Sequence, residues 1–340
     1  MTNLKIGLLS KSGRGYALAN SDKSALFTAE RIALRPNLSS SEAFQIIARA
    51  CVQHFRLNEA LLVKNGSVQA LHQSRIAIRR LRSALSLFKP MVRGQKYKRL
   101  KKRLRSVSHQ FGEARNLDVY VAQTTAPEAG RQFRPTLLSQ AVHIQEARDQ
   151  AYDNVLNTLQ SERFHHFMQE LDAWIQQGRW RTSDKPRNQA ARKQKVEEFA
   201  ATALKKGRHE LKRHGRHLKR LSPEERHRFR IGVKKLRYAC ECFSGLSIDA
   251  QHRKRYQTFI ATLGQLQSRL GDLNDIQNAN EIESKQASHK RVPGRKSRDR
   301  NKNDQGQRID ELLVSACEAY QRFSDAQPFW NKQSGEDRDI

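Results

Sequence analysis

Basic side chains recur at intervals of three and four residues in two segments of the sequence, 71–88 and 226–243. On an α-helix, at about 100° per residue, such positions share one side. Arginine and lysine donate charged hydrogen bonds to phosphate, and a protonated histidine donates from both ring nitrogens. These residue types at this spacing predict the binding of an anion. The residues in the two stripes are His72, Arg75, Arg79, Arg82, His227, Arg230, Lys234 and Arg237.

The two segments form an internal repeat. His72 corresponds to His227, 155 residues later, and the basic and aromatic positions that follow keep the same register. Each copy precedes a helical pattern that leads to a glycine-containing, carboxylate-rich turn, at 111–118 and at 270–275. Two similar helical halves in one chain predict pseudo-two-fold symmetry, with matching faces that meet across a groove.

Two further helical patterns, 97–111 and 204–221, carry cations beside their apolar stripes. The cations are Lys98, Lys101, Arg105, Lys205, Arg208 and Lys212. On one helix, ordinary flanking positions with snorkelling stems explain such cations best. On four helices, two of them repeated, cations at the same shoulder favour a shared groove. Convergent cations repel, and a bound polyanion offsets that repulsion.

The charge of the whole chain also favours a polyanionic partner. Lys plus Arg number 64 against 34 for Asp plus Glu, a formal net charge of +30. A surface that serves only solubility, or a basic tail, is the alternative, but the basic residues run along much of the chain. Nucleic acid, polyphosphate and an anionic membrane surface are the partner classes. No apolar run reaches transmembrane length, so a membrane-spanning protein is not expected.

The apolar periodicity predicts an all-α protein. Ser39 and Glu42 have the spacing of a capping box before the first helix, and one helical pattern covers 190–220. The four cysteines match neither a disulfide framework nor a zinc site, so free thiols in a reducing cytosol are expected. The expected organisation is an irregular segment at 1–37, helical halves at 38–180 and 190–330, a flexible linker at 286–306 and a tail at 331–340.

Four motifs, in order, resemble those of the CHAD family, the conserved histidine α-helical domain: LHQSRIAIRRLRSALSLFKP, FGEARNLDV, HRFRIGVKKLRYACECF and LGDLND. The resemblance covers about residues 38–330 and implies two four-helix bundles related by pseudo-two-fold symmetry. It also implies inorganic polyphosphate held by basic residues along a central groove, often at polyphosphate granules, here in the cytoplasm. By position, it assigns ligand roles to the two basic stripes and to Arg115, while Asn116 stands where the family commonly has Asp. Residues 12–36 resemble the end of a CYTH domain, the triphosphate-tunnel fold that often precedes CHAD.

Nonspecific nucleic-acid binding, above all of RNA, is the alternative function. Charge alone permits it, but the binding of single strands usually adds aromatic side chains that stack on bases. Aromatic residues make up 7% of the chain, and only Tyr238 lies near the basic stripes. Polyphosphate has no bases and requires no such rings, so we expect polyphosphate as the main partner and nucleic acid as a weak one.

An enzyme is the third hypothesis. The sequence contains no P-loop and no HExxH motif. Glu162 and His165 form one ExxH motif, but a ferritin-like di-metal site requires two ExxH motifs and two further glutamates, and we do not find this full set. Asp272 and Asp275 are better explained by pairing with arginine or by capping a turn. We therefore expect no catalysis, no metal and no cofactor.

Overall fold

A computed structural model describes residues 26–35, 37–124, 135–178, 180, 186–246, 250–287 and 295–330. The chain divides into two compact units, Met1–Ile32 with Leu38–Gln194, and Ala33–Asn37 with Lys195–Ile340. The described residues form helices and their connections, with no β-strand among them, which confirms the predicted all-α fold for this part of the chain. Within the same residues, no helix combines the length and the apolarity needed to cross a membrane.

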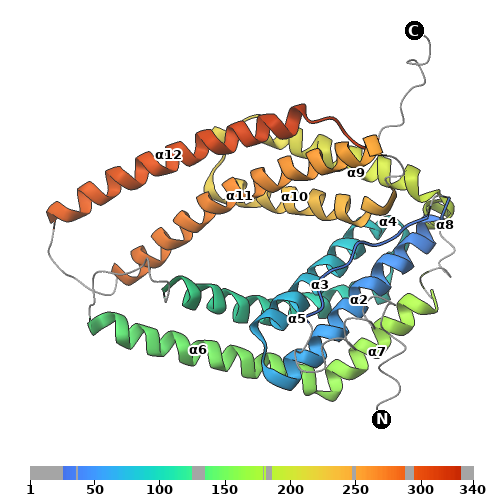
Figure 1. Ribbon diagram of the computed structural model, residues 1–340, viewed down its shortest axis with the longest axis horizontal. Coiled ribbons are helices and arrows are strands. Elements are labelled where there is room, and N and C mark those ends of the chain that lie inside the picture. Colours follow the sequence, from blue (N-terminus) through green and yellow to red (C-terminus); the bar gives the residue numbers. More distant parts are fainter. Residues whose placement is uncertain are drawn as a thin grey trace, which may run out of the picture. The chain divides into compact units, whose positions relative to one another are not determined.

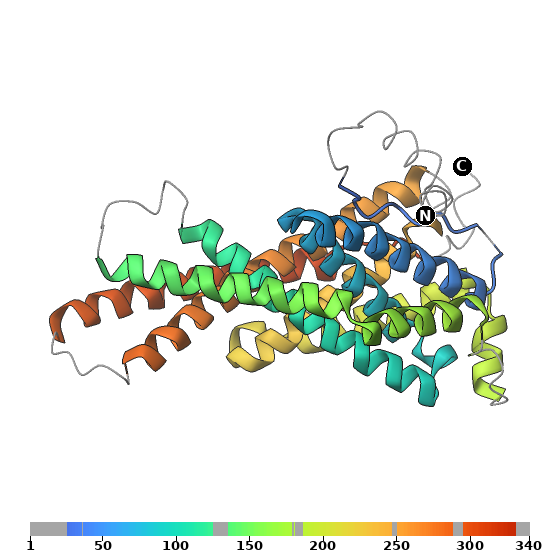
Figure 2. The same ribbon diagram turned by 90° about the horizontal axis from the view of Figure 1, so that it is seen from below.

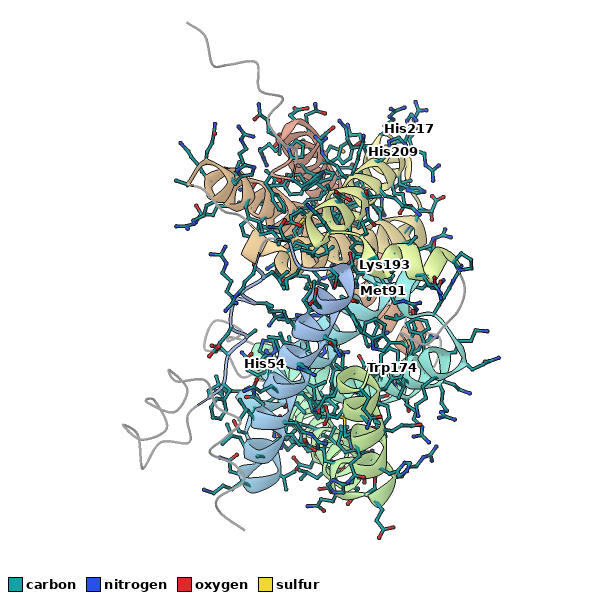
Figure 3. The ribbon with its side chains drawn as sticks, turned by 90° about the vertical axis from the view of Figure 1, so that its right-hand side faces the viewer. His54, Met91, Trp174, Lys193, His209 and His217 are labelled. Carbon is teal, nitrogen blue, oxygen red and sulfur yellow. The ribbon has the colours of Figure 1, made fainter. Side chains whose placement is uncertain are left out.

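The first unit is built on α2, α3 and α5, which lie side by side (Figure 1). Helix α5 also packs against α6, and α7 packs against α2. The short helices α4 and α8 lie together, where Figure 3 labels Met91 and Lys193. The helices of this unit are α2 (Ser40–Asn65), α3 (Val68–Leu87), α4 (Lys89–Val92), α5 (Gln95–Thr124), α6 (Pro135–Gln160), α7 (Glu162–Gln176) and α8 (Pro186–Lys193).

Local sequence determines where α2 and α3 begin and end. The Ser39 hydroxyl accepts the backbone N–H of Glu42, and the Glu42 carboxylate accepts the backbone N–H of Ser39, so the predicted capping box is confirmed. Gly66 ends α2 in the left-handed region, at φ 62°, where a side chain would be strained. Ser67 then caps α3 by accepting the N–H of Ala70. These caps place His72 in the second turn of α3.

The core of the first unit is aromatic and aliphatic. The ring of Phe44 on α2 lies 5.4 Å from Phe88 and 5.2 Å from Trp180, between ring centroids. The apolar stripe predicted for 71–88 is buried, with every member at most 3% exposed. Its members are Leu71, Ile78, Leu81, Leu85 and Phe88. Because this stripe faces the core, the neighbouring basic stripe is left at its border.

An extended segment before α2 lies against the first unit. The backbone carbonyl of Phe27 accepts hydrogen bonds from His54 Nε2 at 3.0 Å and from Asn58 Nδ2 at 2.8 Å. Both side chains come from α2, on which Figure 3 labels His54. Ile32 is buried at 4% exposure. The described part of the N-terminal segment has no regular secondary structure, and side chains of α2 hold it.

The second unit consists mainly of α9, α10, α11 and α12. Figure 1 shows α11 and α12 side by side and antiparallel, and α10 packs against both α9 and α11. Ser222 and Glu225 form a second capping box at the start of α10. Gly215 leaves room for the ring of Tyr320, which would clash with any Cβ at this position. The bounds are α9 (Val196–Gly215), η4 (Leu218–Arg220), α10 (Pro223–Cys242), η5 (Ser244–Leu246), α11 (Ala250–Ala287) and α12 (Arg295–Asp325).

The two units share an order of helix packing. In the first unit, α2 packs on α3, α3 on α5 and α5 on α6, and in the second, α9 packs on α10, α10 on α11 and α11 on α12. The repeated segments 71–88 and 226–243 coincide with α3 and α10, the second helix of each series. Each copy of the sequence repeat therefore forms the second helix of the packing series in its unit. The groove between matching faces stays a prediction.

Three features differ from the sequence analysis. The turns expected at 111–118 and 270–275 are helical, because these residues lie inside α5 and α11. A glycine and carboxylates lower helix propensity without ending a helix. The pattern at 190–220 is not one helix: α8 ends at Lys193, and α9 begins at Val196. Lys195 adopts extended backbone at this break, and the Gln194 carbonyl accepts the backbone N–H of Ser40 at 2.8 Å. The expected linker at 286–306 is helical at both ends, because α11 continues to Ala287 and α12 begins at Arg295. A shortage of apolar residues does not by itself exclude helix, and the lysine, arginine and glutamine residues of this segment have good helix propensity.

The helices α6 and α7 follow one another with a single residue between them (Figure 2). Ser161 caps α7 by accepting the N–H of Phe164 at 3.2 Å. Phe164 and Phe167 point into the core of the first unit and are each 3% exposed. This connection brings polar residues of both helices toward α5, where two ionic clusters form.

Candidate functional site

The helices α3 and α5 bring six cationic or imidazole side chains together in the first unit. We call this set the first basic face: His72, Arg75, Arg79 and Arg82 of α3 with Arg105 and Arg115 of α5. The helices α3 and α5 pack directly on one another, and this packing fixes where their arginines lie. All four residues contributed by α3 are partly exposed.

The charges of three arginines of this face act on the pKa of His72. Its pKa is lowered below the ordinary range, first by burial and then by the charges of Arg115, Arg79 and Arg75. Asp118 acts in the opposite direction. A neutral imidazole is therefore favoured while the face is empty, and an anion that approached these cations would favour the protonated form.

Arg82 and Arg105 meet further along the same two helices. Arg82 Nη1 donates to Ser108 Oγ at 2.7 Å. Burial and, second, the charge of Arg105 lower the pKa of Arg82. Among the described residues, neither arginine forms an ion pair with a carboxylate. This end of the face therefore carries positive charge that no carboxylate of the described residues neutralises through an ion pair.

The other two predicted cations of α5 lie nearer its start. Lys98 is exposed, and the ammonium of Lys101 lies 5.6 Å from the ring centroid of Tyr97. Tyr97 is buried, at 4% exposure. The stem of Lys101 is thus supported by an aromatic ring, while its charge remains at the surface.

A buried carboxylate that the sequence analysis did not assign to the site stands behind Arg115. Asp118 has 2% of its side chain exposed, and its oxygens accept from Arg148 Nε at 2.9 Å and from the Tyr152 hydroxyl at 2.9 Å. Arg115 Nη1 lies 3.9 Å from the same carboxylate. Asp118 is therefore a positioning residue, because it holds Arg115 of the first basic face and Arg148 of α6 together.

The second unit presents a shorter basic face on α10. We call His227, Arg230, Lys234 and Arg237 the second basic face. His227 Nδ1 is hydrogen-bonded to Asn274 Oδ1 at 2.9 Å. The Glu241 carboxylate partly neutralises Arg237, whose Nε donates to it at 3.1 Å. Arg237 Nη1 also donates to Gln267 Oε1 at 3.4 Å.

Arg230 of this face approaches the backbone of α11 closely. A Cβ added at Gly271 would lie 3.2 Å from Arg230 Nη2, which is tighter than ordinary contact. The absence of a side chain at Gly271 therefore allows the guanidinium to approach α11, which is helical through the expected turn at 270–275. Asp272 of the same motif is 3.8 Å from Arg269, as the sequence analysis expected, while the side chain of Asp275 lies outside the described residues.

The two faces use the same register. Arg82 contacts Ser108, and its repeat partner Arg237 contacts Gln267, which is 159 residues after Ser108. His72 is influenced by Arg115, and its repeat partner His227 contacts Asn274, again 159 residues later. One hydrogen-bonding position and one electrostatic neighbour therefore recur in the same register, in agreement with the shared order of helix packing.

The predicted cations of α9 behave differently from one another. Lys205 is exposed. Arg208 Nη2 donates to the backbone carbonyls of Ser324 at 2.8 Å and Ala326 at 3.0 Å, and Lys212 Nζ lies 3.3 Å from the Ser324 carbonyl. Arg208 and Lys212 thus satisfy carbonyls at the C-terminal end of α12. The sequence analysis missed this structural role, because nothing in the pattern of α9 shows which helix end it meets.

A metal centre finds no support in the described residues, where no group of three or more His, Cys, Asp or Glu side chains is placed to hold an ion. The described geometry is therefore one of hydrogen-bond donors and positive charge. Such a site can hold an anion with several oxygen atoms.

A family model described as the CHAD domain matches residues 46–282. The chain belongs to the CHAD family. This match includes both basic faces, so the family membership predicted from the four motifs is confirmed. The resemblance of 12–36 to a CYTH domain stays a prediction, and most of that segment lies outside the described residues.

Two solved structures share the CHAD fold of this chain. The crystal structure of the CHAD domain from the plant Ricinus communis matches with a TM-score of 0.66 and 23% sequence identity, over 89% of this chain and 98% of that one. PptA from Streptomyces chartreusis matches with a TM-score of 0.58 and 18% identity, over 84% of this chain and 100% of that one. At these identities the likeness concerns the fold alone. No curated protein matches the chain.

Proposed function

We propose that this CHAD protein binds inorganic polyphosphate on its basic faces without acting on it chemically. The observation that carries the proposal is the first basic face on the packed helices α3 and α5, where the pKa of His72 is lowered first by burial and then by the charges of Arg115, Arg79 and Arg75. Like charges held close together destabilise the free protein, and a polyanion removes that cost on binding. The second unit repeats the arrangement, which suits a ligand with a repeating charge.

Polyphosphate fits the chemistry of the faces better than nucleic acid does. Arginine and lysine recognise phosphate oxygens, and no base-stacking ring is needed for that purpose. Tyr238, the aromatic residue predicted to lie near the basic stripes, is buried at 8% exposure, and so is Tyr97 at 4%. Neither ring is available to a base.

One exposed aromatic side chain keeps RNA as the second candidate. Tyr120 of α5 is 46% exposed, and Val119 beside it is 38% exposed. Tyr120 lies on the same helix as Arg105 and Arg115. A base stacked on this ring, with its phosphate on the arginines, would be a minimal single-strand site.

In the cell, we propose that binding serves to attach this protein to polyphosphate granules in the cytoplasm, as a scaffold or a targeting protein. Such a role requires affinity for a long polymer and requires no turnover. A fluorescent fusion should gather at granules in cells that accumulate polyphosphate and should spread when the polymer is depleted.

A competition experiment tests the proposed function. Labelled long-chain polyphosphate is bound to the protein at physiological salt, and unlabelled polyphosphate, single-stranded RNA, double-stranded DNA and heparin are added as competitors. Displacement by polyphosphate at far lower concentrations of anionic groups than by the other polymers supports a dedicated polyphosphate protein. Equal competition by all four polymers would reduce the protein to a generic cation and overturn the proposal.

A further inference from the structure

A second group of cations on α5 lies outside both basic faces. Lys96, Arg99 and Arg103 all contact the carboxylate of Glu170 on α7. Arg99 Nη2 lies 2.6 Å from Oε1, and Arg103 Nη1 lies 3.3 Å from Oε2. Three positive charges therefore meet one negative charge, which leaves an excess of two.

This cluster cannot be part of the first basic face. At about 100° per residue, Lys96, Arg99 and Arg103 lie roughly 160° around α5 from Lys98, Lys101 and Arg105. The two sets thus occupy opposite sides of one helix. The cluster faces α7, whereas Arg105 is a neighbour of Arg82 on α3.

The exposure of the four side chains shows where the excess charge is directed. The Glu170 side chain is only 13% exposed, while Arg99 is 57% and Lys96 is 38% exposed. An ammonium has three donors and a guanidinium has five, but one carboxylate has about four lone-pair sites. The carboxylate is covered, and donors that it does not use remain open to solvent.

The remaining member, Arg103, is fixed by the core. Its guanidinium carbon lies 5.8 Å from the ring centroid of Phe167, one turn before Glu170 on α7. A cation held over a ring loses less conformational freedom when it binds an anion. The cluster is therefore preorganised on one side by Arg103 and adaptable on the other through Arg99.

We propose that Lys96, Arg99 and Arg103 form a further anion site for a phosphoryl group of condensed phosphate, in which Glu170 is an internal anion that competes with the ligand. The site rests on the proposed function, because its ligand is the same polymer. The Lys96 hydrogen bond is the main reason that the pKa of Glu170 lies below its ordinary range, so Glu170 is charged at neutral pH and weakens phosphate binding. Removal of that charge should therefore strengthen it.

The test uses tripolyphosphate as the probe and the full chain as the protein, with isothermal titration calorimetry at low and at physiological salt. Glu170→Gln keeps the shape of the side chain and removes its charge, and it should tighten tripolyphosphate binding by about three- to tenfold. Adding Arg99→Gln should cancel that gain. The matched control is Arg49→Gln, because Arg49 is an exposed arginine on α2 of the same unit.

The outcomes separate this site from the basic faces. The Glu170→Gln gain should persist when Arg79→Glu disables the first basic face, and unchanged or weaker binding in folded Glu170→Gln would overturn the further site. If Glu170→Gln does not fold, Arg99→Gln and Arg49→Gln are compared as single substitutions. Arg99→Gln should weaken tripolyphosphate binding more than Arg49→Gln, and equal losses would overturn the site.

A protein that fails to bind long-chain polyphosphate at all would overturn the proposed function instead. Equal strengthening of RNA binding by Glu170→Gln would assign the cluster to nucleic acid.

Discussion

His227 Nδ1 lies 2.9 Å from Asn274 Oδ1, at the place in the second unit where the first unit sets Arg115 beside His72. The two histidines share a register but differ in the chemistry of their neighbours. An amide oxygen accepts the ring N–H, whereas a guanidinium disfavours the charged imidazole. The two repeat-related histidines therefore lie in different electrostatic surroundings. Of the two, His72 is the histidine whose protonation should respond to a bound anion.

Polyphosphate binding should take up protons at His72. In the free protein, burial and three arginines hold the pKa of His72 below its ordinary value, and nearby phosphate would raise it. Affinity should therefore increase as the pH falls through the ligand-bound pKa and should level off below the lower, ligand-free pKa. Calorimetry in buffers of different ionisation enthalpy measures the proton uptake.

The control for this linkage is a histidine that belongs to neither basic face. His209 is exposed on α9, where Figure 3 labels it. His72→Gln should abolish most of the proton uptake, and His209→Gln should leave it unchanged. Uptake that survives in His72→Gln would show that another group carries the linkage.

Charge reversal at repeat-related positions should weaken binding without unfolding the protein. Arg79→Glu and Lys234→Glu should each lower the affinity for polyphosphate on the order of tenfold at physiological salt. A His72/His227 double alanine variant should act in the same direction. Circular dichroism should show unchanged helix content, since both charged positions are partly exposed. Arg49→Glu carries the same change in net charge, and an equal loss in that variant would mean that the faces have no special role.

Tyr120 separates the two candidate ligands. Its ring is 46% exposed on α5, so Tyr120→Ala should cost the fold little. We expect this variant to bind polyphosphate as the unaltered chain does, because the polymer has no base to stack. Binding of single-stranded RNA should fall, by about 1 kcal/mol or more if one base stacks there. A loss of polyphosphate binding of the same size would contradict this division, and filter binding with both polymers measures it.

Patterns within a helix predicted much of the fold and of the basic faces. The stripes of α3 and α10, the capping box at Ser39 and the buried position of Leu85 follow from helical periodicity and cap chemistry, which act over a few residues. The repeat added the correspondence between α3 and α10. These features needed no knowledge of how distant segments meet.

Contacts between helices distant in sequence were not predictable in this way. Nothing near Asp118 shows that Arg148, 30 residues later, will donate to it at 2.9 Å. Likewise, the pattern of α9 gives Arg208 the appearance of a ligand for anions, although its guanidinium reaches the end of α12. Which carboxylate or carbonyl a cation meets depends on helix pairing, and one sequence gives the periodicity of each helix without its partner.

Loss of the Asp118 charge should destabilise the first unit. Its carboxylate is buried and accepts from Arg148 and Tyr152, and this contact raises the pKa of the Tyr152 hydroxyl, together with burial as the larger cause. Asp118→Asn should lower the free energy of unfolding by about 3 kcal/mol, because it leaves buried donors and a guanidinium poorly matched. Denaturant unfolding measures the change. Glu113→Gln is the control, since Glu113 is an exposed partner of His109 on the same helix, and comparable losses in the two variants would argue against a special role for Asp118.

Arg208 and Lys205 should separate stability from binding on α9. Arg208→Ala removes two hydrogen bonds to the carbonyls of Ser324 and Ala326, and it should lower the free energy of unfolding by about 1–3 kcal/mol. Lys205 is exposed, so Lys205→Ala should leave the melting temperature unchanged, and any loss it shows should be in polyphosphate affinity. Calorimetric melting and polyphosphate titration of both variants, at a temperature where both are folded, measure the two effects. A larger loss of affinity in Arg208→Ala than in Lys205→Ala would mean that the guanidinium leaves α12 to reach the ligand.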